Sequence, residues 1–590
     1  MAKKKKTDYK SYLLLAVILL VTFLAYKPAL KNGWTKWDDT AYILENPSVQ
    51  NLSGENVKKM FSNYYMGNYT PLTFLSFAIE KSFFGESPKV FILMNILFHL
   101  INCLLIFFFV RMLLEDSIIA LISAFLFAVH PLHVESVAWI AERKDVLYAF
   151  YFFLALISYV KYLKSEKVKW LLISALLMLF SVLSKSTAVV LPFILIVIDY
   201  FLGKKILSKK TILEKIPFLI ITIIFVYIGT KAAQTNVADI SSYDLSIFER
   251  IACAGFALVQ YLSKLFVPTN LSAYYPYPFL SSETMPSSIW LFFALAVLFF
   301  GGLIYYFRAN KLVLFSVLFF LISLFPALQF FPVGDALYAD RFLYLPMLGF
   351  ILPFAFLVKK ISEKKERANL VLTSVIAVSL VFSYVTFHRT KIWNSPKTLW
   401  TDVVKKNNDI SLAHVNLANA FFEENKADSA MAHYNLAIEK NPNNTEAFYN
   451  RAAVLLQTEK YQNAIADFKK VLAKNEKDAM SWVGMGLCYN GLNRFDSAVM
   501  SFDKSLLIDS SFGDVFVKRG LAYIMMNKYS SALNDFNKAI MLQPTNADAF
   551  GKRGAVKIQT GDTIGACTDF HKAQELGMQE AEQAIKEFCK

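Results

Sequence analysis

The chain has 590 residues, of which 56% are hydrophobic and only 18% are charged, and its net charge is +15. A soluble chain of this length would have a lower apolar share, so the composition excludes an ordinary soluble multidomain protein. The basic residues cluster beside apolar stretches, as cytoplasmic loops of membrane proteins do, which argues against nucleic-acid binding. No pair of cysteines has metal-ligand spacing, although Cys567 and Cys589 can form a disulfide in an oxidising compartment.

Apolar runs fill the first two thirds of the sequence and predict an all-α, polytopic membrane domain. A span needs about 20 apolar residues, or somewhat fewer when the helix is buried among others. The lysine-rich N-terminus is followed by no small-residue cleavage site and predicts an uncleaved anchor. We predict roughly eleven spans, at residues 12–29, 90–112, 117–131, 145–163, 170–184, 187–203, 216–231, 287–306, 312–328, 342–358 and 369–387.

A twelfth apolar stretch, Phe248 to Val267, contains Gln260 and Lys264. If it does not cross, and the N-terminus is cytoplasmic, the basic loops all lie on the side that the positive-inside rule requires. We therefore predict an interfacial or re-entrant helix here and an extracytoplasmic C-terminus. The loops in question are Lys161–Lys169, Gly203–Lys215, Arg308–Lys311 and Lys359–Arg367.

From Ser411 the sequence becomes polar and repeats every 34 residues. A small residue recurs at Ala418, Ala452, Gly486, Gly520 and Gly554. An alanine follows it at Ala430, Ala464, Ala498, Ala532 and Ala566. An aromatic residue comes next, at Tyr434, Phe468, Phe502, Phe536 and Phe570. This period is typical of tetratricopeptide repeats. We predict a membrane domain at 1–388, a juxtamembrane linker at 389–410, five repeats at 411–577 and a capping helix at 578–590. Such a superhelix binds an extended peptide or a partner helix in its concave groove; the alternatives are a rigid spacer and a dimerisation surface.

Ionisable residues gather at the predicted outer ends of the spans, where they indicate a functional site. Asp38 and Asp39 follow the first span, and adjacent carboxylates near apolar surroundings raise each other's pKa, as a general base requires. A helix N-cap with a spare acid is the structural alternative. Further outer candidates are His130, His133, Glu135, Arg143 and Asp145 in the second outer loop, Lys185 in a helical hairpin, and Asp335, Asp340, Arg341 and Tyr344 in the fourth outer segment.

Each of these candidates has a structural alternative. His130, His133 and Glu135 can act as metal ligands, but their spacing is not that of a zinc motif, so metal dependence stays open. Lys185 suits a lipid phosphate or is a snorkelling lysine. Arg341 can bind a phosphate with two donors or pair with Asp340. Carboxylates and cations together at the membrane surface suit an enzyme whose substrate combines a phosphate headgroup with a lipid tail.

Several motifs resemble the transmembrane and tetratricopeptide repeat-containing O-mannosyltransferases. The similar segments are WDDTAYI from Trp37, NYTPLTFLSF at 68–77, MNILFHLINCLL at 94–105, HPLHVESVAWIAERKDVL at 130–147, LSK at 183–185, FFPVGDALYADRFLYLPMLGF at 330–350 and WNSPKTLW from Trp393. The resemblance covers essentially the whole chain, in order. It implies the C-type glycosyltransferase fold and inverting transfer of a sugar, mannose by resemblance, from a polyprenyl-phosphate donor to protein hydroxyls outside the cytoplasm.

The resemblance also implies roles for residues. The catalytic acid of the first outer loop falls on Asp38 or Asp39, and we favour Asp39 as the base with Asp38 positioning it. Lys185 and Arg341 would hold the departing donor phosphate. Glu135 and Asp145 would orient the acceptor or the sugar. The chain departs from the family pattern at Ser186, where an acid is usual, and at 142–145, where it has Glu-Arg-Lys-Asp.

Two other functions remain open at this stage: transfer to a glycolipid or cell-wall polymer, and a non-catalytic membrane scaffold with protein-binding repeats. The composition favours a bacterial inner membrane, with the N-terminus cytoplasmic and the repeats periplasmic. Its eukaryotic equivalent would be an endoplasmic-reticulum protein with lumenal repeats. Apart from the lipid-linked sugar donor, we expect no certain cofactor. The expected partners are the bilayer and an acceptor protein or peptide bound by the repeats.

Overall fold

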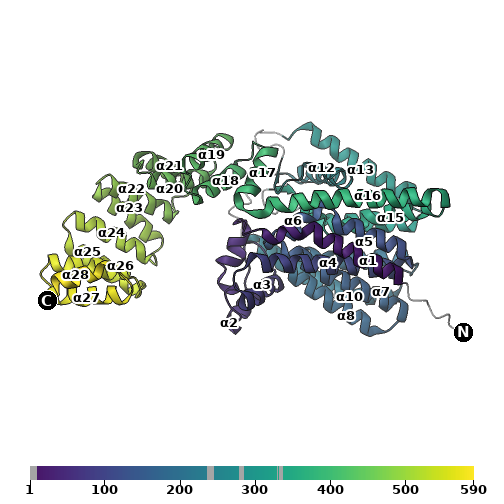
Figure 1. The fold of residues 1–590 in the computed structure, drawn as a ribbon, viewed down its shortest axis with the longest axis horizontal. Helices are drawn as coiled ribbons and strands as arrows, with labels where there is room; N and C mark the ends of the chain where they lie inside the picture. Colours follow the sequence, from purple (N-terminus) through teal and green to yellow (C-terminus); the bar gives the residue numbers. More distant parts are fainter. Residues whose placement is uncertain (1–8, 236–244, 278–284, 329, 331–335, 590) are drawn as a thin grey trace. The chain divides into compact units, whose positions relative to one another are not determined.

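The computed structural model describes residues 9–235, 245–277, 285–328, 330 and 336–589. The N-terminal lysines at 3–6 and Asp335 lie outside the described residues. The chain divides into two compact units, Met1–Lys406 and Asn407–Lys590, which we call the membrane unit and the repeat unit. Both are mostly helical (Figure 1).

Long apolar helices make up most of the membrane unit. Among the described residues, six segments are long and apolar enough to cross a membrane: Tyr9–Lys31, Pro88–Leu114, Ile140–Ser165, Lys209–Gln234, Ser287–Phe307 and Glu366–Asn394. They contain α1 (Tyr9–Tyr26), α4 (Pro88–Leu114), α7 (Arg143–Ser165), α10 (Lys209–Gln234), α13 (Ser287–Phe307) and α16 (Lys365–Arg389). Ser117–Val129 (α5) and Pro131–Ala138 pass the same test as a pair bent by 54°, which makes seven.

This number is smaller than the predicted eleven because the other predicted spans are short helices. Val168–Ser184, which is α8, Ser186–Phe201 and Lys311–Ala327 are apolar but have only 10–17 residues each. The second and third contain α9 (Leu191–Phe201) and α14 (Lys311–Leu324), and α15 (Met347–Ser362) has 16 residues. The twelfth apolar stretch forms α12 (Ile247–Phe266), which is not among the candidate spans in the described part of the chain.

Shorter elements between the spans build the polar end of the membrane unit. They are α2 (Gly54–Ser62), α3 (Pro71–Phe84), α6 (Val134–Ala138), a π-helix at Thr40–Leu44 and several 3-10 turns. Two short strands, β1 (Tyr275–Pro276) and β2 (Ala336–Tyr338), pair antiparallel. The described fold is therefore mostly helical and not all-α as predicted. The predicted linker is itself largely helical, with a 3-10 turn at Thr390–Asn394 followed by α17 (Pro396–Lys406).

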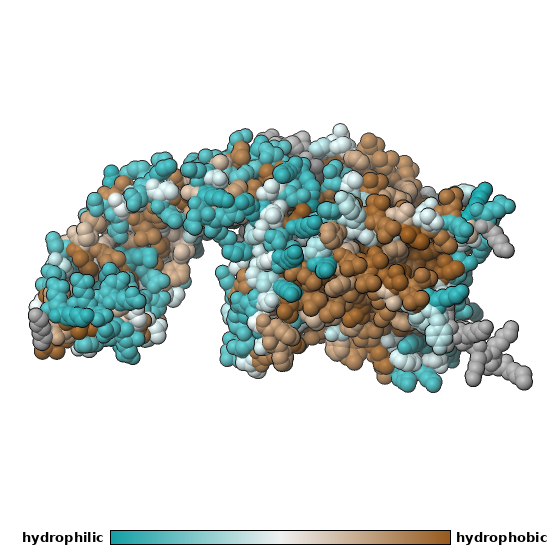
Figure 2. Space-filling model, viewed as in Figure 1, coloured by the Kyte–Doolittle hydropathy of each residue, from teal (hydrophilic) through white to brown (hydrophobic). Residues whose placement is uncertain are grey.

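The surface of the membrane unit is divided by polarity. Hydrophobic residues cover the sides of its long helices, and hydrophilic residues gather at the ends (Figure 2). Large apolar side chains are exposed on α1, α10, α13 and α16, including Leu13, Ile223, Leu298 and Val381. Exposed apolar area of this extent is typical of helices that face lipid.

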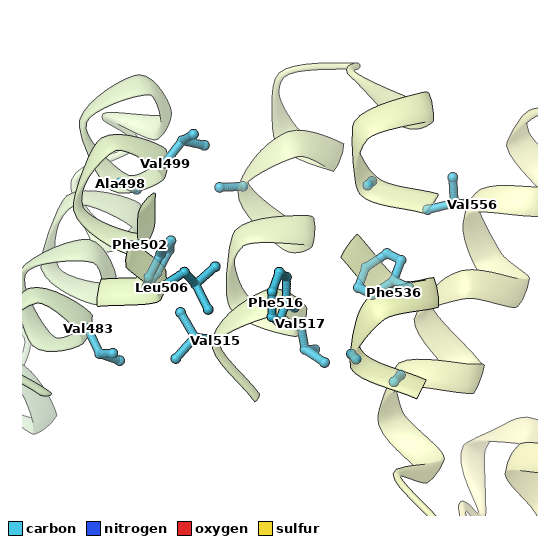
Figure 3. Packing of buried hydrophobic residues seen from close by; sticks show 14 residues of the cluster. Val483, Ala498, Val499, Phe502, Leu506, Val515, Phe516, Val517, Phe536 and Val556 are labelled. Atoms are coloured by element: carbon cyan, nitrogen blue, oxygen red, sulfur yellow. The ribbon is translucent and has the colours of Figure 1, made fainter. Parts of the chain in front are cut away.

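The repeat unit consists of five consecutive helix pairs and a final short helix. The helices are α18 (Ser411–Glu423), α19 (Ala427–Lys440), α20 (Thr445–Gln457), α21 (Tyr461–Lys474), α22 (Ala479–Gly491), α23 (Phe495–Ile508), α24 (Gly513–Met525), α25 (Tyr529–Leu542), α26 (Ala547–Gln559), α27 (Thr563–Glu575) and α28 (Glu580–Phe588). A Cβ atom at Gly486 would lie 2.5 Å from the ring of Phe502, which explains the small residue in each period. Phe502 and Phe536 are fully buried between neighbouring helices (Figure 3).

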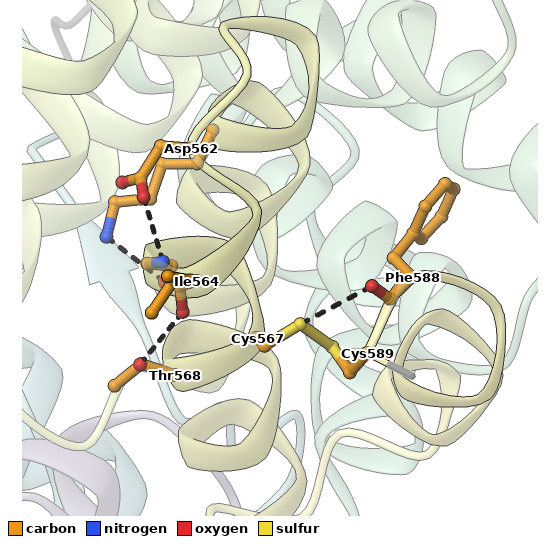
Figure 4. The surroundings of a disulfide bond; sticks show 8 residues. Asp562, Ile564, Cys567, Thr568, Phe588 and Cys589 are labelled. Atoms are coloured by element: carbon orange, nitrogen blue, oxygen red, sulfur yellow. Dashed lines mark hydrogen bonds between the residues drawn. A yellow bond between two sulfur atoms is a disulfide. The ribbon is translucent and has the colours of Figure 1, made fainter.

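A disulfide joins the last helix to the repeat before it. Cys567 on α27 is bonded to Cys589, at the end of α28, as the sequence allowed (Figure 4). Ala581 is the buried residue of α28, so the helix covers the last repeat with little apolar area of its own. The covalent link therefore holds a cap that packing alone holds weakly.

Candidate active site

Asp39 is fully buried and its carboxylate is held by three hydrogen bonds. The backbone N–H and the hydroxyl of Thr35 donate to Oδ2 at 2.8 and 2.6 Å, and the backbone N–H of Ala141 donates to Oδ1 at 3.0 Å. Lys36 has a left-handed backbone (φ 53°), which turns the chain so that Thr35 faces Asp39. Burial raises the pKa of Asp39 to about 6, against the lowering effect of these bonds. Asp39 thus ties the first outer loop to the second.

Asp38, its neighbour, has different surroundings. It is only partly buried, and no described residue makes a hydrogen bond or an ion pair with it. Burial raises its pKa, while the charges of Lys144 and Arg341 lower it and that of Glu142 raises it. Asp38 is therefore an accessible carboxylate within electrostatic range of two cations. A group placed in this way can accept a proton from a bound substrate.

Carboxylates between α5 and the start of α7 hold three cations: Lys144 and Arg341, which act on Asp38, and Lys185, which acts on Glu142. Lys185, between α8 and α9, pairs with Asp145, which also accepts a hydrogen bond from Ser136 at 2.9 Å. Arg341 pairs with Glu135, and its Nε lies 3.2 Å from Glu142.

The third cation is Lys144, whose Nζ lies 3.2 Å from a carboxylate oxygen of Glu142. Lys185 and Arg341 are partly accessible and Lys144 is buried, and all three keep further N–H donors for a ligand. We call these three cations, their carboxylates Glu135, Glu142 and Asp145, and Asp38 the charged cluster.

Arg143 and Asp340 make their hydrogen bonds with residues outside the charged cluster. The guanidinium of Arg143 is fully buried, where it pairs with Glu80 and donates to Asn95 and to the carbonyl of Phe91. Asp340 accepts a hydrogen bond from the hydroxyl of Tyr275 at 2.9 Å, and among the described residues it forms no ion pair with Arg341. Both therefore read as structural residues of the polar end.

His130, His133 and Tyr344 lie in an aromatic core around Phe127. The ring centroids of His133 lie 4.3 Å from Phe127 and 4.7 Å from Tyr344. His130 contacts the carbonyl of Leu265, while His99 bonds the hydroxyl of Tyr344 at 2.8 Å. Within the described ranges, no three His, Cys, Asp or Glu side chains come together as metal ligands.

A stack of four tryptophans supports the first outer loop. Trp37 stacks on Trp139 at 4.7 Å between ring centroids and meets Trp400 edge-on at 4.9 Å, and Trp139 stacks on Trp393 at 5.3 Å. The guanidinium of Arg341 lies 5.6 Å from the ring centre of Trp139. The stack therefore joins both outer loops and α17 directly beside the charged cluster.

Backbone contacts strengthen the same junction. The backbone N–H of Gly33 donates to the carbonyl of Asn394 at 2.9 Å, and the side chains of Asn32 and Asn394 bond the carbonyls of Thr390 and Lys31. Residues more than 350 positions apart are thus bonded together at the base of the Asp38 loop.

Thr35, Glu80 and the tryptophan stack were not among the residues expected from the sequence. The paired tryptophans of WNSPKTLW were noted only as part of a resemblance. Five of the eight tryptophans of the chain, the four of the stack and Trp34, fall in three short segments, and this clustering was the available signal. Nothing in the sequence indicated that Glu80 on α3 would reach Arg143.

Comparison with known families agrees with the resemblance. Residues 68–231 match the family model described as dolichyl-phosphate-mannose-protein mannosyltransferase. This range includes Glu135, Asp145 and Lys185 but neither Asp38 nor Arg341. Residues 418–459, 449–513 and 513–546 match tetratricopeptide repeat models. The repeat-protein crystal structure of YrrB has 21% identity and a TM-score of 0.28, over 32% of this chain and 97% of that one.

The curated relatives are O-mannosyl-transferases. Protein O-mannosyl-transferase TMTC3 of Mus musculus is 25% identical over 474 residues, covering 72% of this chain and 51% of the relative. The Caenorhabditis elegans protein O-mannosyl-transferase F38B6.6 is 26% identical over 457 residues, covering 72% and 63%. The chain spans about half the length of the first of these relatives. The chain is thus a multi-pass membrane protein with tetratricopeptide repeats, and its residues 68–231 are similar to the mannosyltransferase family. It is distantly similar to the TMTC proteins, which confirms the resemblance.

Proposed function

We propose that the protein is an inverting glycosyltransferase that moves mannose from a polyprenyl-phosphate donor to hydroxyl groups of proteins on the extracytoplasmic side. The observation that carries the proposal is the isolated carboxylate of Asp38 beside the cations Lys144 and Arg341. A glycosyl transfer needs a base for the acceptor hydroxyl and positive charge for the departing phosphate. The charged cluster supplies both within one polar end of the membrane unit.

The geometry supports Asp38 as the base and Asp39 as the positioning residue, which reverses the roles that we favoured from the sequence. Asp39 has no free acceptor position facing solvent, because three donors occupy its oxygens and it is fully buried. Asp38 would take the proton of the acceptor hydroxyl as that oxygen forms its bond to the anomeric carbon. The bond from this carbon to the phosphate oxygen breaks on the opposite face, which inverts the configuration.

Lys185 and Arg341 would stabilise the polyprenyl phosphate as it leaves. The charge on the phosphate rises while the glycosidic bond breaks, and cations already in place stabilise that change without reorganisation. Glu135 and Asp145 hold Arg341 and Lys185 in position, so their role in this proposal is to orient the cations rather than to contact the sugar.

We propose eleven crossings for the membrane unit: the six long segments, the bent pair and the four shorter apolar helices. This count places the charged cluster and the repeats outside the cytoplasm and keeps the basic loops inside. The disulfide between Cys567 and Cys589 supports the same side, because disulfides persist in oxidising compartments. A bacterial inner membrane with periplasmic repeats that recruit the acceptor fits this arrangement.

The test uses the purified full-length protein in detergent, with radiolabelled polyprenyl-phosphate mannose and a periplasmic protein extract. Label should appear on protein with the wild type and with the exposed-surface control Lys538→Gln, and it should be absent with Asp38→Asn. Label on lipid or polymer instead of protein would show that the acceptor is not a protein. Equal labelling by the wild type and Asp38→Asn would remove Asp38 from the mechanism.

A further inference from the structure

Three of the five repeats share an internal ion-pair ladder. Arg451 forms two hydrogen bonds with Asp467, at 2.7 Å each, and a third with Asn435. Arg519 pairs in the same way with Asp535 and Asp503, and Arg553 pairs with Asp569 and Asn537. Each arginine comes from the first helix of its repeat and joins the second helices of two successive repeats. The arginines also lie over aromatic rings, at 5.5 Å from Phe448 and 5.4 Å from Phe516 and Phe550.

The ladder is interrupted in the third repeat. The positions that correspond by the 34-residue period carry Met485 instead of arginine, Ser501 instead of aspartate and Lys469 instead of the second acceptor. Met485 has no guanidinium with which to form these ion pairs. A hollow of about 510 Å³ lies beside it, lined by Lys469, Leu472, Ala473, Lys474, Glu476, Trp482 and Met485.

The hollow combines an apolar floor with a basic rim. Leu472 and Met485 are buried in the floor and Trp482 is partly exposed beside them. The Trp482 indole N–H is already bonded to the carbonyl of Glu476 at 2.9 Å, so its ring face is the part left for contact. Lys504 lies 4.1 Å from the centre of that ring, and Lys469 and Lys504 form no ion pair in the described part of the repeats.

We propose that this hollow binds a peptide segment that carries a large apolar side chain next to acidic ones. The apolar side chain would contact Trp482 and Met485, and the flanking carboxylates would pair with Lys469 and Lys504, which form no ion pair with any acid among the described residues. Glu476 is the one acid in the lining, which also contains Lys469 and Lys474, and Lys504 lies beside it over the Trp482 ring. Under the proposed function this segment marks the acceptor proteins, but the binding itself does not depend on any transferase activity.

Full-length protein in detergent would be titrated into fluorescein-labelled pools of ten-residue peptides. One pool fixes Phe, Leu or Trp between Asp and Glu residues, and the matched pool replaces the acids by Asn and Gln. The acidic pool should bind at least roughly tenfold more tightly, as expected for one or two charge pairs at an interface. Equal binding of both pools, or no binding of either, would overturn the proposal.

Two variants locate the binding. The triple change Met485→Arg, Ser501→Asp and Lys469→Asn restores the ladder of the other repeats, so it should fill the hollow and abolish preference for the acidic pool without lowering the unfolding temperature. Lys504→Glu should weaken binding, whereas Lys538→Glu, at the same position one repeat later, should not. Binding that survives ladder restoration but is lost with Lys518→Glu and Lys552→Glu would assign the peptide to another face.

Because these measurements need no donor, they separate this inference from the proposed function. If the protein binds the peptide but transfers no sugar, the proposed peptide site would stand and the proposed transferase activity would be wrong. Transfer that is unchanged in the ladder-restored protein, together with lost peptide binding, would show that the hollow does not select the acceptor.

Discussion

The backbone N–H of Ala141 donates a hydrogen bond to the buried carboxylate of Asp39, at 3.0 Å. This bond joins the loop that follows α1 and carries Asp38 to the loop between α5 and α7 that carries Glu135 and Glu142. The two adjacent aspartates therefore have different surroundings. Asp39 holds the two loops together, whereas Asp38 forms no hydrogen bond or ion pair with any residue that the structure describes.

Replacing each aspartate by asparagine should separate these roles. Asp38→Asn should lower the transfer rate by about 10²–10⁴-fold, the usual contribution of a general base, with little change in the unfolding temperature. Asp39→Asn turns an amide N–H toward a backbone donor, and a buried unsatisfied donor costs about 1–3 kcal/mol, so it should lower the unfolding temperature as well as the rate. Thermal unfolding and initial rates measured on the same preparations decide this, and the reverse pattern would restore Asp39 as the base.

As the pH is lowered, the transfer rate should begin to fall at a higher pH than it would if the aspartates had their ordinary pKa. Asp38 has a raised pKa because of burial, and that of Asp39 is raised to about 6 for the same reason. Both must be ionised for the proposed mechanism, so the rate should increase as the pH rises through about 6 and then level off, instead of near the ordinary value of about 4. A rate profile that stays flat down to the ordinary value, in protein shown to be folded throughout by circular dichroism, would contradict this.

Lys185 and Arg143 should respond differently to loss of charge. Under the proposed mechanism, Lys185→Met removes a cation that would stabilise the departing donor phosphate, and it should lower the rate by about 10²–10³-fold, as the loss of one transition-state contact does. Arg143→Met leaves Glu80 buried and unpaired, which costs about 3–5 kcal/mol, so its main effect should be on unfolding. Rates at saturating donor, compared with unfolding temperatures, distinguish the two, and a stable but inactive Arg143→Met protein would place Arg143 in the site.

The repeats and the membrane character of the chain could be predicted from the sequence because both depend on local periodicity. The 34-residue period fixes which residues touch, and Gly486 and Phe502 meet as that period requires. The bond between Cys567 and Cys589 could also be named as possible from the sequence, because the chain has only five cysteines. The number of spans was harder to predict from the sequence. Helices such as α8 and α15 are shorter than a bilayer needs and depend on their neighbours for burial.

The charged cluster could be predicted in composition but not in pairing. Arg341 was expected to bind phosphate or to pair with Asp340, its neighbour in sequence, whereas it pairs with Glu135, 206 residues away. Likewise, the roles of Asp38 and Asp39 depend on the turn at Thr35 and on the distant Ala141. Contacts of this kind are decided by the packing of the whole unit, and a single sequence contains no pattern that reports them.

Trp400 should act on catalysis although it lies outside the charged cluster. It meets Trp37 edge-on at 4.9 Å, and Trp37 precedes Asp38 directly. Trp400→Leu should therefore lower the rate at saturating donor by about 10-fold or more, since small displacements of a catalytic group are costly. Trp400→Phe, which keeps an aromatic edge, should recover most of the activity. Equal rates for Leu and Phe would mean that the stack only stabilises the fold, which the unfolding temperature would then show.

Reduction of the disulfide should loosen the end of the repeat unit and leave the membrane unit unchanged. Cys567 and Cys589 are 22 residues apart, and closing a loop of this length contributes about 3 kcal/mol in the chain-entropy model. Cys567→Ser should therefore speed hydrogen exchange in α27 and α28, while the rate of transfer to a small hydroxyl acceptor stays the same. Cys589→Ser and the double variant should exchange as fast as the single one, because one bond is lost in each. If the double variant exchanged much faster than either single variant, the two sulfurs would be acting separately rather than as a bond.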